Sequence, residues 1–395
     1  MSKLQKLIQE LCPDGVEYKT LGEIATIKNG RDYKHLGKGN VPVYGSGGIM
    51  TYVDTYVYNK PTVLIPRKGS LGNLFYVDTP FWNVDTIFYT EVDTQQIDVK
   101  YLYYLLAKEH LENLNKAGGV PSLTQSILNK IILPIPPLEV QNEIVRILDH
   151  FTDLAAEMQA ELQARKEQYE YYRNKLLTFD KIGEGAQSVT WMKMSDVLYS
   201  IRTGLNPRQF FKLNTPDAHS YYVTIREFNG GRLVFSDSTD RINESARMLC
   251  NNRSNLEIND VLFSGTGTIG ETYVIDSTPI NWNIKEGVYA LKPKLHIIYP
   301  KYLKYILSQS KIRSDYIKLA EGGTVKSISM KKLNVFSIPV PTLSEQERII
   351  NILDKFEALT KDLSQGLPAE MAAVQEQYEY YRNKLLSFPR SKISA

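Results

Sequence analysis

One segment of the sequence has the spacing of a cofactor-binding loop. Phe263-Ser264-Gly265-Thr266-Gly267 fits the F-x-G-x-G pattern that can bind S-adenosylmethionine, and Gly265, Gly267 and Gly270 fit G-x-G-x-x-G. Both patterns require a helix after the turn, because the helix N-terminus receives the ligand. Here the β-branched and aromatic run Thr272-Tyr273-Val274-Ile275 follows, which is typical of a strand. The sequence therefore favours a plain turn over a cofactor site.

No other catalytic pattern occurs in the sequence. It contains no Walker-type phosphate loop, no H-E-x-x-H motif and no N-P-P-Y or D-P-P-Y tetrapeptide for methyl transfer to an amine. Only Cys12 and Cys250 and five histidines are present, without close Cys/His or His/carboxylate spacing. This content argues against a metal site and a disulfide framework, and it suits a reducing cytoplasm. We expect no catalytic residue, no metal and no cofactor bound by this chain.

The charge is unevenly spread over the 395 residues. Net charge is only +3, but residues 190–335 carry 20 Lys and Arg against 13 Asp and Glu, a net of +7. Residues 136–189 carry 6 against 10. A basic body is expected where a polyanion binds, although a solvated basic face explains the same numbers. No apolar run approaches the ~20 residues that a membrane-spanning helix needs, so we expect no membrane association.

The chain contains a long internal repeat. The segment E-Q-Y-E-Y-Y-R-N-K-L-L-T-F at Glu167–Phe179 recurs at Glu376–Phe388 with one Thr-to-Ser change. Other short matches keep the same order, among them Trp82-Asn83 with Trp282-Asn283. Such self-similarity predicts two tandem units, each a diverged body followed by a nearly identical tail.

Both tails have the apolar period of a coiled coil. Steps of four and three alternate over about five heptads, and this 3.5-residue period distinguishes a coiled coil from an amphipathic surface helix. In the second tail Gly366-Leu367-Pro368 predicts a break, with Pro368 in the first turn of a new helix. The predicted interhelical seam consists of Ile144, Leu148, Phe151, Leu162, Tyr169, Tyr172, Leu176, Leu353, Phe356, Tyr378, Tyr381 and Leu385.

Matching seams in one chain favour pairing with each other, and we expect an antiparallel pair. Two alternatives remain: each tail packs on its own body, or the seams mediate homodimerisation.

The sequence of the bodies predicts a mixed α/β fold with many short strands, in which a strand, a Gly-containing turn and a second strand recur. Helices are expected at residues 99–115 and 300–319, and Trp82 and Trp282 are expected in the core. The predicted fold class is α+β with an internal pseudo-two-fold repeat.

Two diverged bodies, each followed by a helix ending E-Q-Y-E-Y-Y-R-N-K-L-L-x-F, resemble the specificity subunit of type I restriction-modification enzymes. The lead-in P-I-P-P-L-x-x-Q-x-x-I-V-x-I-L-D at Pro134, its second copy at Pro339 and T-L-G-E-I at Thr20 carry the same resemblance. It covers essentially the whole chain and is strongest in the tails. It implies target recognition domains at residues 1–135 and 181–336, and conserved helical spacers at 136–180 and 337–395.

The resemblance also implies the division of labour. Each body would bind one half of a bipartite site in double-stranded DNA, and the helices would set the spacer and dock two modification (methyltransferase) subunits. Restriction and motor subunits would join in the full complex. The chain itself would be non-catalytic, with S-adenosylmethionine, ATP and Mg²⁺ bound only by partner subunits. The expected location is the cytoplasm.

Candidate DNA contacts are polar or basic side chains on loops, since base edges are read by hydrogen bonds and phosphates are held by Arg and Lys. In the first body they are Arg31, Lys34, Tyr44, Ser46, Arg67, Lys68 and Ser70. In the second body they are Arg202, Asn206, Arg208, Arg226, Thr266 and Thr268. Two other functions stay open: an S-adenosylmethionine-dependent methyltransferase resting on F-x-G-x-G, and a tandem protein scaffold that binds no DNA.

Overall fold

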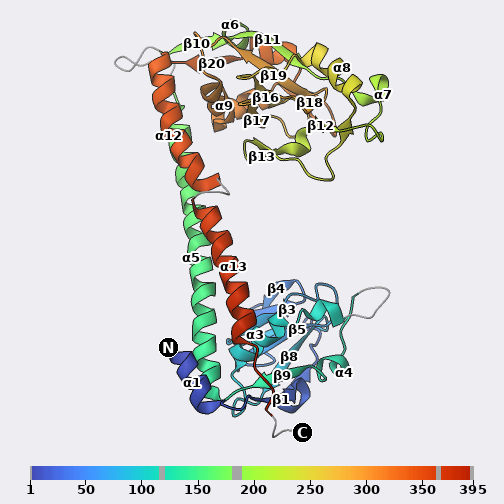
Figure 1. Ribbon diagram of the computed structural model, residues 1–395, viewed down its shortest axis with the longest axis vertical. Helices are drawn as coiled ribbons and strands as arrows, with labels where there is room; N and C mark the ends of the chain where they lie inside the picture. The colour runs from blue at the N-terminus through green and yellow to red at the C-terminus, as the bar shows by residue number, and fades with distance from the viewer. Residues whose placement is uncertain (1, 115–120, 180–188, 362–365, 392–395) are drawn as a thin grey trace. The chain divides into compact units, whose positions relative to one another are not determined.

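The computed structural model describes residues 2–114, 121–179, 189–361 and 366–391. The chain divides into two compact units: unit 1 comprises Met1–Gln159 and Glu370–Ala395, and unit 2 comprises Ala160–Ala369. Both units mix strands with helices, and each contains parts of both tails (Figure 1). The predicted boundaries at residues 135, 180 and 336 stay a prediction, because the compact units divide the tails between them.

Unit 1 is built on two main sheets. The larger is antiparallel throughout with the strand order β2-β8-β5-β6, and the smaller has the order β4-β3-β7 with β3 and β7 parallel. A separate antiparallel pair joins β1 to β9. The strands are β1 (Glu17–Thr20), β2 (Ala25–Lys28), β3 (Val41–Gly45), β4 (Gly48–Val53), β5 (Thr62–Pro66), β6 (Phe75–Val77), β7 (Trp82–Asn83), β8 (Ile87–Val92) and β9 (Ile132–Ile135).

Helix α3 covers the larger sheet of unit 1 and supplies much of its core. Asp98 caps the helix by accepting a 2.9 Å hydrogen bond from the backbone nitrogen of Tyr101, and Tyr101, Leu102 and Leu105 are buried. The helices of this body are α1 (Lys3–Leu11), α2 (Leu21–Ile24), α3 (Val99–Lys108), the 3₁₀ helix η1 (Leu111–Leu114) and α4 (Gln125–Leu128).

Unit 2 repeats the sheet topology of unit 1. Its larger sheet has the order β11-β19-β16-β17, and its smaller sheet has the order β15-β12-β18 with β12 and β18 parallel. The pair β10–β20 corresponds to β1–β9. The strands are β10 (Thr190–Lys193), β11 (Leu198–Thr203), β12 (Ser220–Val223), β13 (Phe228–Asn229), β14 (Arg232–Leu233), β15 (Arg241–Ile242), β16 (Val261–Ser264), β17 (Thr272–Val274), β18 (Trp282–Ile284), β19 (Val288–Pro293) and β20 (Ser337–Val340).

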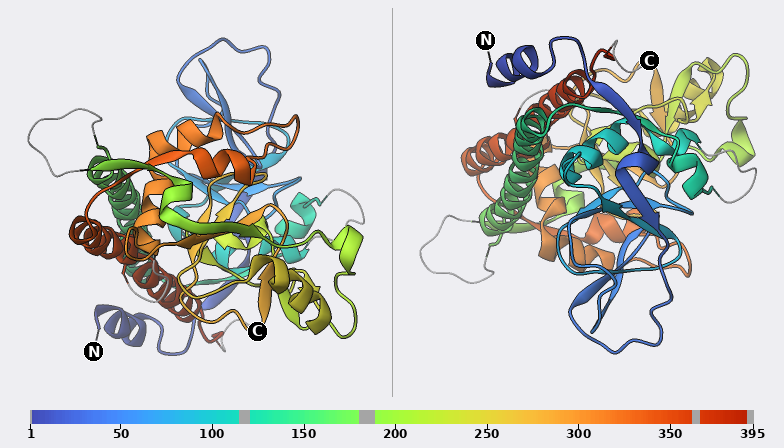
Figure 2. Two further views of the ribbon diagram at one scale, coloured as in Figure 1. Left: turned by 90° about the horizontal axis from the view of Figure 1, so that it is seen from above. Right: turned by 90° about the horizontal axis from the view of Figure 1, so that it is seen from below.

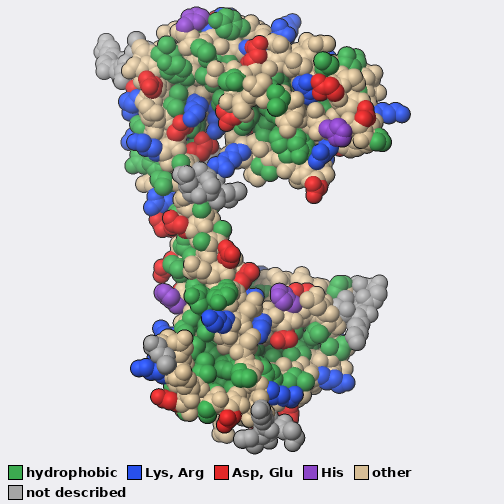
Figure 3. All heavy atoms as spheres, in the orientation of Figure 1, with side chains coloured by type: hydrophobic (Ala, Val, Ile, Leu, Met, Phe, Trp, Pro, Cys, Tyr) green, Lys and Arg blue, Asp and Glu red, His purple; other side chains and the backbone are tan. Residues whose placement is uncertain are grey.

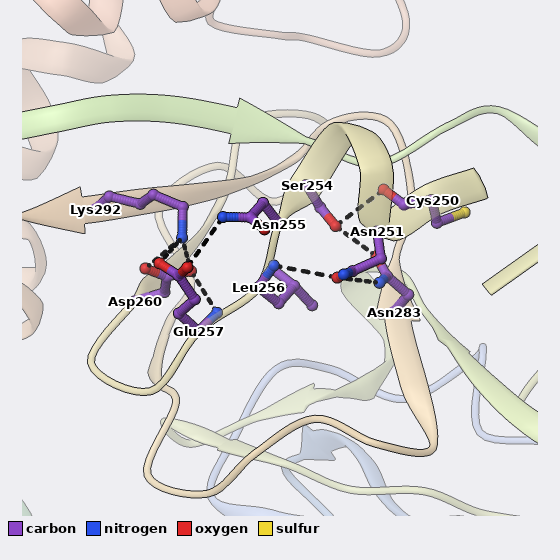
Figure 4. Close-up of polar contacts among 9 residues, drawn as sticks. All are labelled: Cys250, Asn251, Ser254, Asn255, Leu256, Glu257, Asp260, Asn283 and Lys292. Atoms are coloured by element: carbon purple, nitrogen blue, oxygen red, sulfur yellow. Dashed lines mark hydrogen bonds and ion pairs between the residues drawn. The ribbon is translucent and has the colours of Figure 1, made fainter. Parts of the chain in front are cut away.

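The helices of unit 2 include α8, which is anchored to β18 by buried polar contacts. Ser254 at its C-terminal end donates a 2.8 Å hydrogen bond to Asn283 Oδ1, beside a second contact in which Lys292 reaches Asp260 at 2.8 Å (Figure 4). Burial raises the pKa of Asp260 even beside this ammonium. The helices of this body are α6 (Met194–Val197), α7 (Pro207–Phe210), the 3₁₀ helix η2 (Ile225–Glu227), α8 (Glu244–Ser254), α9 (Pro300–Ser308), α10 (Ser310–Ile317) and α11 (Met330–Val335).

The shared framework confirms several sequence predictions. Helices α3 and η1, and α9 and α10, occupy the two expected helical segments. Trp82 and Trp282 are both buried. Strand β17 follows the F-x-G-x-G turn, as the sequence predicted, at the position where a cofactor-binding motif would have a helix.

The tails form α5 (Leu138–Leu176), α12 (Leu343–Lys361) and α13 (Leu367–Leu385). In unit 1 the start of α5 packs on the end of α13: Ile144 and Leu148 share one buried cluster with Leu386. In unit 2 the end of α5 packs on the start of α12, where Leu177 and Leu353 share a cluster. Each pair is therefore antiparallel, as predicted, and α5 and α13 lie side by side in both views (Figure 2).

Ten of the twelve predicted seam residues are buried or partly buried, and two are exposed. Ile144, Leu148, Leu162, Tyr169 and Leu353 are buried, and the other apolar seam positions are partly buried. Tyr172 and Tyr381 instead keep 37% and 40% of their surface exposed. Each stacks one ring face on a phenylalanine of the opposing helix and leaves the remainder to solvent.

The predicted break in the second tail is also present. Gly366 adopts a positive φ of 76°, which favours glycine, and Pro368 is the second residue of α13. The first tail crosses the corresponding region as one continuous helix.

Candidate nucleic-acid interface

Three turns of unit 1 meet at one edge of its sheets; together with residues 121–123 we call them loop cluster 1. They are the β3–β4 turn at Ser46-Gly47, the β5–β6 loop at residues 67–74 and the β7–β8 turn at residues 84–86. Thr86 joins them: its Oγ1 accepts from the Ser46 backbone nitrogen at 3.3 Å, and its carbonyl accepts from Arg67 and Lys68. Asn73 Nδ2 donates to the Ser46 carbonyl at 3.1 Å.

The β5–β6 loop is held in place by backbone contacts from a distant segment. Gly69 donates to the Pro121 carbonyl at 3.1 Å, and Leu123 donates to the Arg67 carbonyl at 2.8 Å. Gly69 has φ +82°, and a Cβ there would lie 3.3 Å from Ser46 Oγ. A side chain at this position would therefore strain the backbone and crowd the neighbouring turn.

Loop cluster 1 is basic but partly neutralised. The Arg67 guanidinium lies over the Phe88 ring at 5.7 Å and donates to the Asp85 carbonyl at 3.4 Å. Lys68 Nζ lies 3.5 Å from Asp85 Oδ2, with both side chains near half-exposed or more. A half-exposed pair of this kind contributes little to stability, so these cations remain available to a phosphate.

The other predicted residues of unit 1 divide into two groups. Arg31 and Lys34 are exposed on the segment after β2, and the Arg31 backbone is fixed by Asn83 at 2.8 Å and Trp82 Nε1 at 3.0 Å. Tyr44 instead packs against Phe75 and Phe81, and burial raises the pKa of its hydroxyl. The structure thus places Tyr44 mainly in the core beneath the turn.

Unit 2 has an equivalent cluster, which we call loop cluster 2: residues 265–270, 285–287 and 326–328. Thr266 forms a bridge with Ser327, and Gly267 donates to the Lys326 carbonyl at 3.0 Å. Gly265 donates to the Gly287 carbonyl at 2.8 Å. Thr266 is partly buried, whereas Thr268 is exposed on a loop closed by Ser264 Oγ, which donates to the Thr268 carbonyl at 2.6 Å.

The remaining predicted residues of unit 2 do not all join this cluster. Asn206 Oδ1 caps α7 by accepting from the Arg208 backbone nitrogen at 3.1 Å, so Asn206 positions the exposed Arg208. Arg226 forms an ion pair with Asp240. Arg202 lies on β11 in a pocket shared with Glu257 and Lys292, apart from loop cluster 2.

The structure adds residues that sequence reasoning missed. Asn73 and Thr86 in unit 1, and Lys326 in unit 2, lie within the clusters. Thr86 and Lys326 stand far from the predicted residues in the sequence, whereas Asn73 follows Ser70 by three residues. A repeat signal could have located the frame: I-K-N-G at Ile27 and I-R-T-G at Ile201 occupy equivalent strand ends. A Cβ on Gly30 would lie 2.0 Å from the Val84 carbonyl oxygen, and one on Gly204 would lie 1.6 Å from that of Ile284.

The loops of both clusters present hydroxyl groups, amide groups and cationic side chains. Such loops can bind a polyanion, with the cations contacting its charges and the polar groups hydrogen-bonding to its other groups. Within residues 2–114, 121–179, 189–361 and 366–391, no group of three or more His, Cys, Asp or Glu side chains is arranged to hold a metal ion. In the same ranges no helix has the length and apolarity needed to cross a bilayer.

Comparison with known proteins agrees with this geometry. Residues 13–165 and 191–373 match the family described as the type I restriction modification DNA specificity domain. The chain is 33% identical over 421 residues to the type I restriction enzyme EcoR124I/EcoR124II specificity subunit of Escherichia coli, covering 99% of this chain and 98% of that protein. It is 30% identical over 407 residues to a putative type I restriction enzyme specificity subunit of Haemophilus influenzae, covering 98% of each.

Solved structures share the fold. A chain from a study of complex assembly and conformational transition of the type I restriction-modification system aligns with a TM-score of 0.62 at 16% identity, covering 95% of this chain and 98% of that chain. The restriction-modification S subunit from M. genitalium aligns with a TM-score of 0.56 at 17% identity, covering 94% and 96%.

Proposed function

The chain belongs to the type I restriction-modification DNA specificity family, and from this premise we propose that loop clusters 1 and 2 each read one half of a bipartite site in double-stranded DNA. The observation that carries the proposal is one sheet topology in both units presenting chemically different loops at equivalent turns. The two halves of an asymmetric DNA site differ in sequence. Reading them requires loops of different chemistry, which here stand on the same sheet scaffold.

The chain is a non-catalytic recognition subunit. Methyl transfer and DNA cleavage therefore belong to the methyltransferase and restriction subunits with which specificity subunits assemble. We propose that S-adenosylmethionine, ATP and Mg²⁺ are bound by those partners alone. The methyltransferase alternative based on F-x-G-x-G loses its support, because a strand takes the place of the ligand-binding helix. We further propose that the complex acts in the cytoplasm, where the two buried cysteines stay reduced.

The cations around loop cluster 1 are proposed to hold phosphates. Arg31, Lys34, Arg67 and Lys68 supply the positive charge, whereas Ser46, Ser70 and Asn73 supply groups for base edges. In unit 2 the corresponding groups are Arg208 and Lys326 for phosphates and Thr266 and Thr268 for bases. Phosphate contacts release counterions, so each one contributes about 0.9 to the slope of log affinity against log salt.

Methylome sequencing of cells with and without this chain tests the proposal most directly. The expected result is a two-part motif that is methylated only when the chain is present. Absence of any chain-dependent methylation in cells that express active methyltransferase subunits would overturn the DNA-recognition assignment and favour the scaffold alternative.

A binding assay with that site then separates base contacts from phosphate contacts. In the assembled complex, Lys34→Ala is expected to lower the salt slope by about 1 while leaving the sequence preference unchanged. Thr268→Ala is expected to relax the preference in one half-site. Lys6→Ala is the matched control, because Lys6 is an exposed lysine on α1, outside loop cluster 1.

A further inference from the structure

Unit 1 carries a run of exposed apolar side chains on an edge strand of its smaller sheet. In the part of the chain that the structure describes, strand β4 pairs with β3 and with no other strand. Ile49, Met50 and Tyr52 of this strand are each at least half-exposed. Hydrophobic side chains reach the surface of unit 1 beside basic ones (Figure 3). An exposed apolar run on an edge strand indicates an interaction surface.

A β-bulge distinguishes Met50 from the rest of this run. Val43 lies opposite Thr51, whereas Tyr44 lies opposite Ile49, so the register of β3 and β4 shifts and Met50 is the extra residue of the bulge. A bulge bends its strand and redirects a side chain, and it interrupts the flat ladder that a second copy of the chain would need for edge-to-edge pairing. The bulge therefore favours a partner that contacts the Met50 side chain over a partner that extends the sheet.

Met50 lies against the turn that joins loop cluster 1. A Cβ on Gly45 would lie 2.7 Å from Met50 Sδ and 3.4 Å from Thr86 Oγ1, so both side chains rest on the same glycine. Thr86 Oγ1 accepts from the Ser46 backbone nitrogen at 3.3 Å, and Asn73 donates to the Ser46 carbonyl at 3.1 Å. The Met50 thioether is therefore held beside a turn that hydrogen bonds have already ordered.

Basic side chains beside the β3–β4 hairpin favour a polyanion as the partner of this apolar surface. A Cβ on Gly69 would lie 3.3 Å from Ser46 Oγ, so the loop that carries Arg67 and Lys68 lies next to the hairpin turn. The major groove of double-stranded DNA admits a two-stranded ribbon, and cations beside such a ribbon can meet the phosphates on either side. An apolar side chain on the ribbon then faces the edges of the bases.

We propose that Met50 reads thymine: its side chain contacts the C5-methyl group of one thymine in the major groove, within the half-site that unit 1 binds. This inference rests on the proposed function and adds a specificity-determining residue to loop cluster 1. Of the four bases in unmodified DNA, thymine alone presents a methyl group in the major groove, and an apolar side chain can discriminate it there. The polar and basic groups of the cluster do not sense that methyl group, because it neither donates nor accepts a hydrogen bond.

The corresponding strands of unit 2 are connected differently. Residues 46–47 alone join β3 to β4, whereas residues 224–240, with η2, β13 and β14, join β12 to β15. The short ribbon that carries Met50 is therefore a feature of unit 1. Methyl reading by this ribbon is expected in one half-site of the bipartite DNA and not in the other.

Binding of the assembled complex to duplexes with deoxyuridine in place of single thymines tests the proposal, because this replacement removes the methyl group and keeps the base pair. With the wild-type chain, deoxyuridine at one position is expected to weaken binding about fourfold, as when one methyl-sized group loses its apolar contact. With Met50→Ala, the affinity for the thymine duplex is expected to fall by about the same factor. The preference for thymine over deoxyuridine at that position is expected to vanish, and this non-additivity identifies a direct contact.

Two further variants serve as controls. Met248→Ala truncates a methionine on α8 that is 57% exposed, as Met50 is, and it is expected to leave the thymine preference unchanged. Met50→Leu keeps an apolar side chain of similar volume and is expected to retain most of the preference. The affected thymine is expected in the half-site whose recognition Thr268→Ala leaves intact.

The inference is overturned if the thymine preference survives in Met50→Ala, or if the wild-type complex binds thymine and deoxyuridine duplexes equally at every position. Self-association of the wild-type chain that Met50→Ala abolishes would assign β4 to a second copy and would overturn the inference as well. In these outcomes the complex still selects its two-part motif, so the proposed function stands. If the complex binds that motif and a scrambled duplex equally, the proposed function fails and this inference fails with it.

Discussion

One buried glutamine attaches each helical tail to a body: Gln141 in the first tail and Gln346 in the second. Gln141 is fully buried and donates through Nε2 to the carbonyls of Gln96 and Pro136, while its Oε1 accepts from the Asp98 backbone at 2.8 Å. Gln346 makes the same three contacts with the corresponding backbone groups of unit 2. Three backbone groups thus depend on one side chain, which explains why glutamine recurs in both lead-in segments.

Gln346→Ala is expected to destabilise unit 2 by about 3 kcal/mol, because buried backbone donors and acceptors lose their partners. Gln163→Ala is the matched control: its amide donates to Glu167 on an exposed helix face, and its effect is expected within about 0.5 kcal/mol. Thermal unfolding of both variants measures the difference, and equal melting temperatures would contradict the fastening role.

The ion pairs that Glu143 forms in unit 1 are expected to weaken in acid. Hydrogen bonds from Arg146 and then Lys3 lower the pKa of this buried carboxyl to about 2. Since the unfolded value is about 4.3, the stabilisation is fully present above that pH and is lost as the pH falls toward 2. The exposed partners reduce the gain to roughly 1–2 kcal/mol. The stability difference between wild type and Glu143→Gln, measured from pH 7 to pH 2.5, is expected to shrink on acidification; a constant difference would refute this origin.

At the scale of elements, the two tails are similar in sequence but differ in continuity. Helix α5 runs unbroken from Leu138 to Leu176, whereas the second tail is divided between α12 and α13. Four additional residues in the second tail account for the difference, because a four-residue insertion disturbs a heptad pattern and Gly366 and Pro368 stand beside it. We therefore expect that the tails can change in length while the apolar contacts between their helices are kept.

Deleting Ala155–Met158 from α5 shortens the helix by about 6 Å and changes its rotation by only about 40°. We expect the gap between the two methylated half-sites to shorten by about two base pairs and the half-sites themselves to stay the same. Single-molecule methylome sequencing of the deletion strain reads both quantities. An unaltered gap would count against the helices as the spacer, whereas altered half-sites would indicate damage to the bodies.

At the scale of the whole molecule, each compact unit is completed by the tail of the other repeat. Leu386, after the second body, lies in the core of unit 1, and Leu177, after the first body, lies in the core of unit 2. Both are almost completely buried. The apolar core of each body is therefore completed in part by a leucine from the tail of the other repeat.

Leu386→Ala is expected to cost unit 1 about 2–5 kcal/mol, and Leu177→Ala to cost unit 2 a similar amount. Each variant is the control for the other, because the two leucines occupy equivalent positions in the repeat. Hydrogen exchange is expected to accelerate in residues 99–108 for the first variant and in residues 300–308 for the second. The reverse pairing, or equal acceleration in both segments, would contradict the exchanged cores.

The sequence alone determined the tandem repeat, the mixed α/β bodies, the helical tails with their break, the family and the lack of catalytic motifs. These properties depend on local periodicity and on identical segments, which need no knowledge of distant contacts. Burial of Trp82 and Trp282 was likewise predictable, because both recur in bodies that otherwise differ.

Only the tertiary structure decided which loops meet. Thr86 and Asn73 join Ser46 because strands far apart in the chain end at one edge, and no local pattern encodes that convergence. It also assigned Tyr44 to the core and Arg202 to a separate pocket. Finally, it exposed Tyr171 while burying Tyr169, since the side of a helix that stays open depends on the partner packed against it.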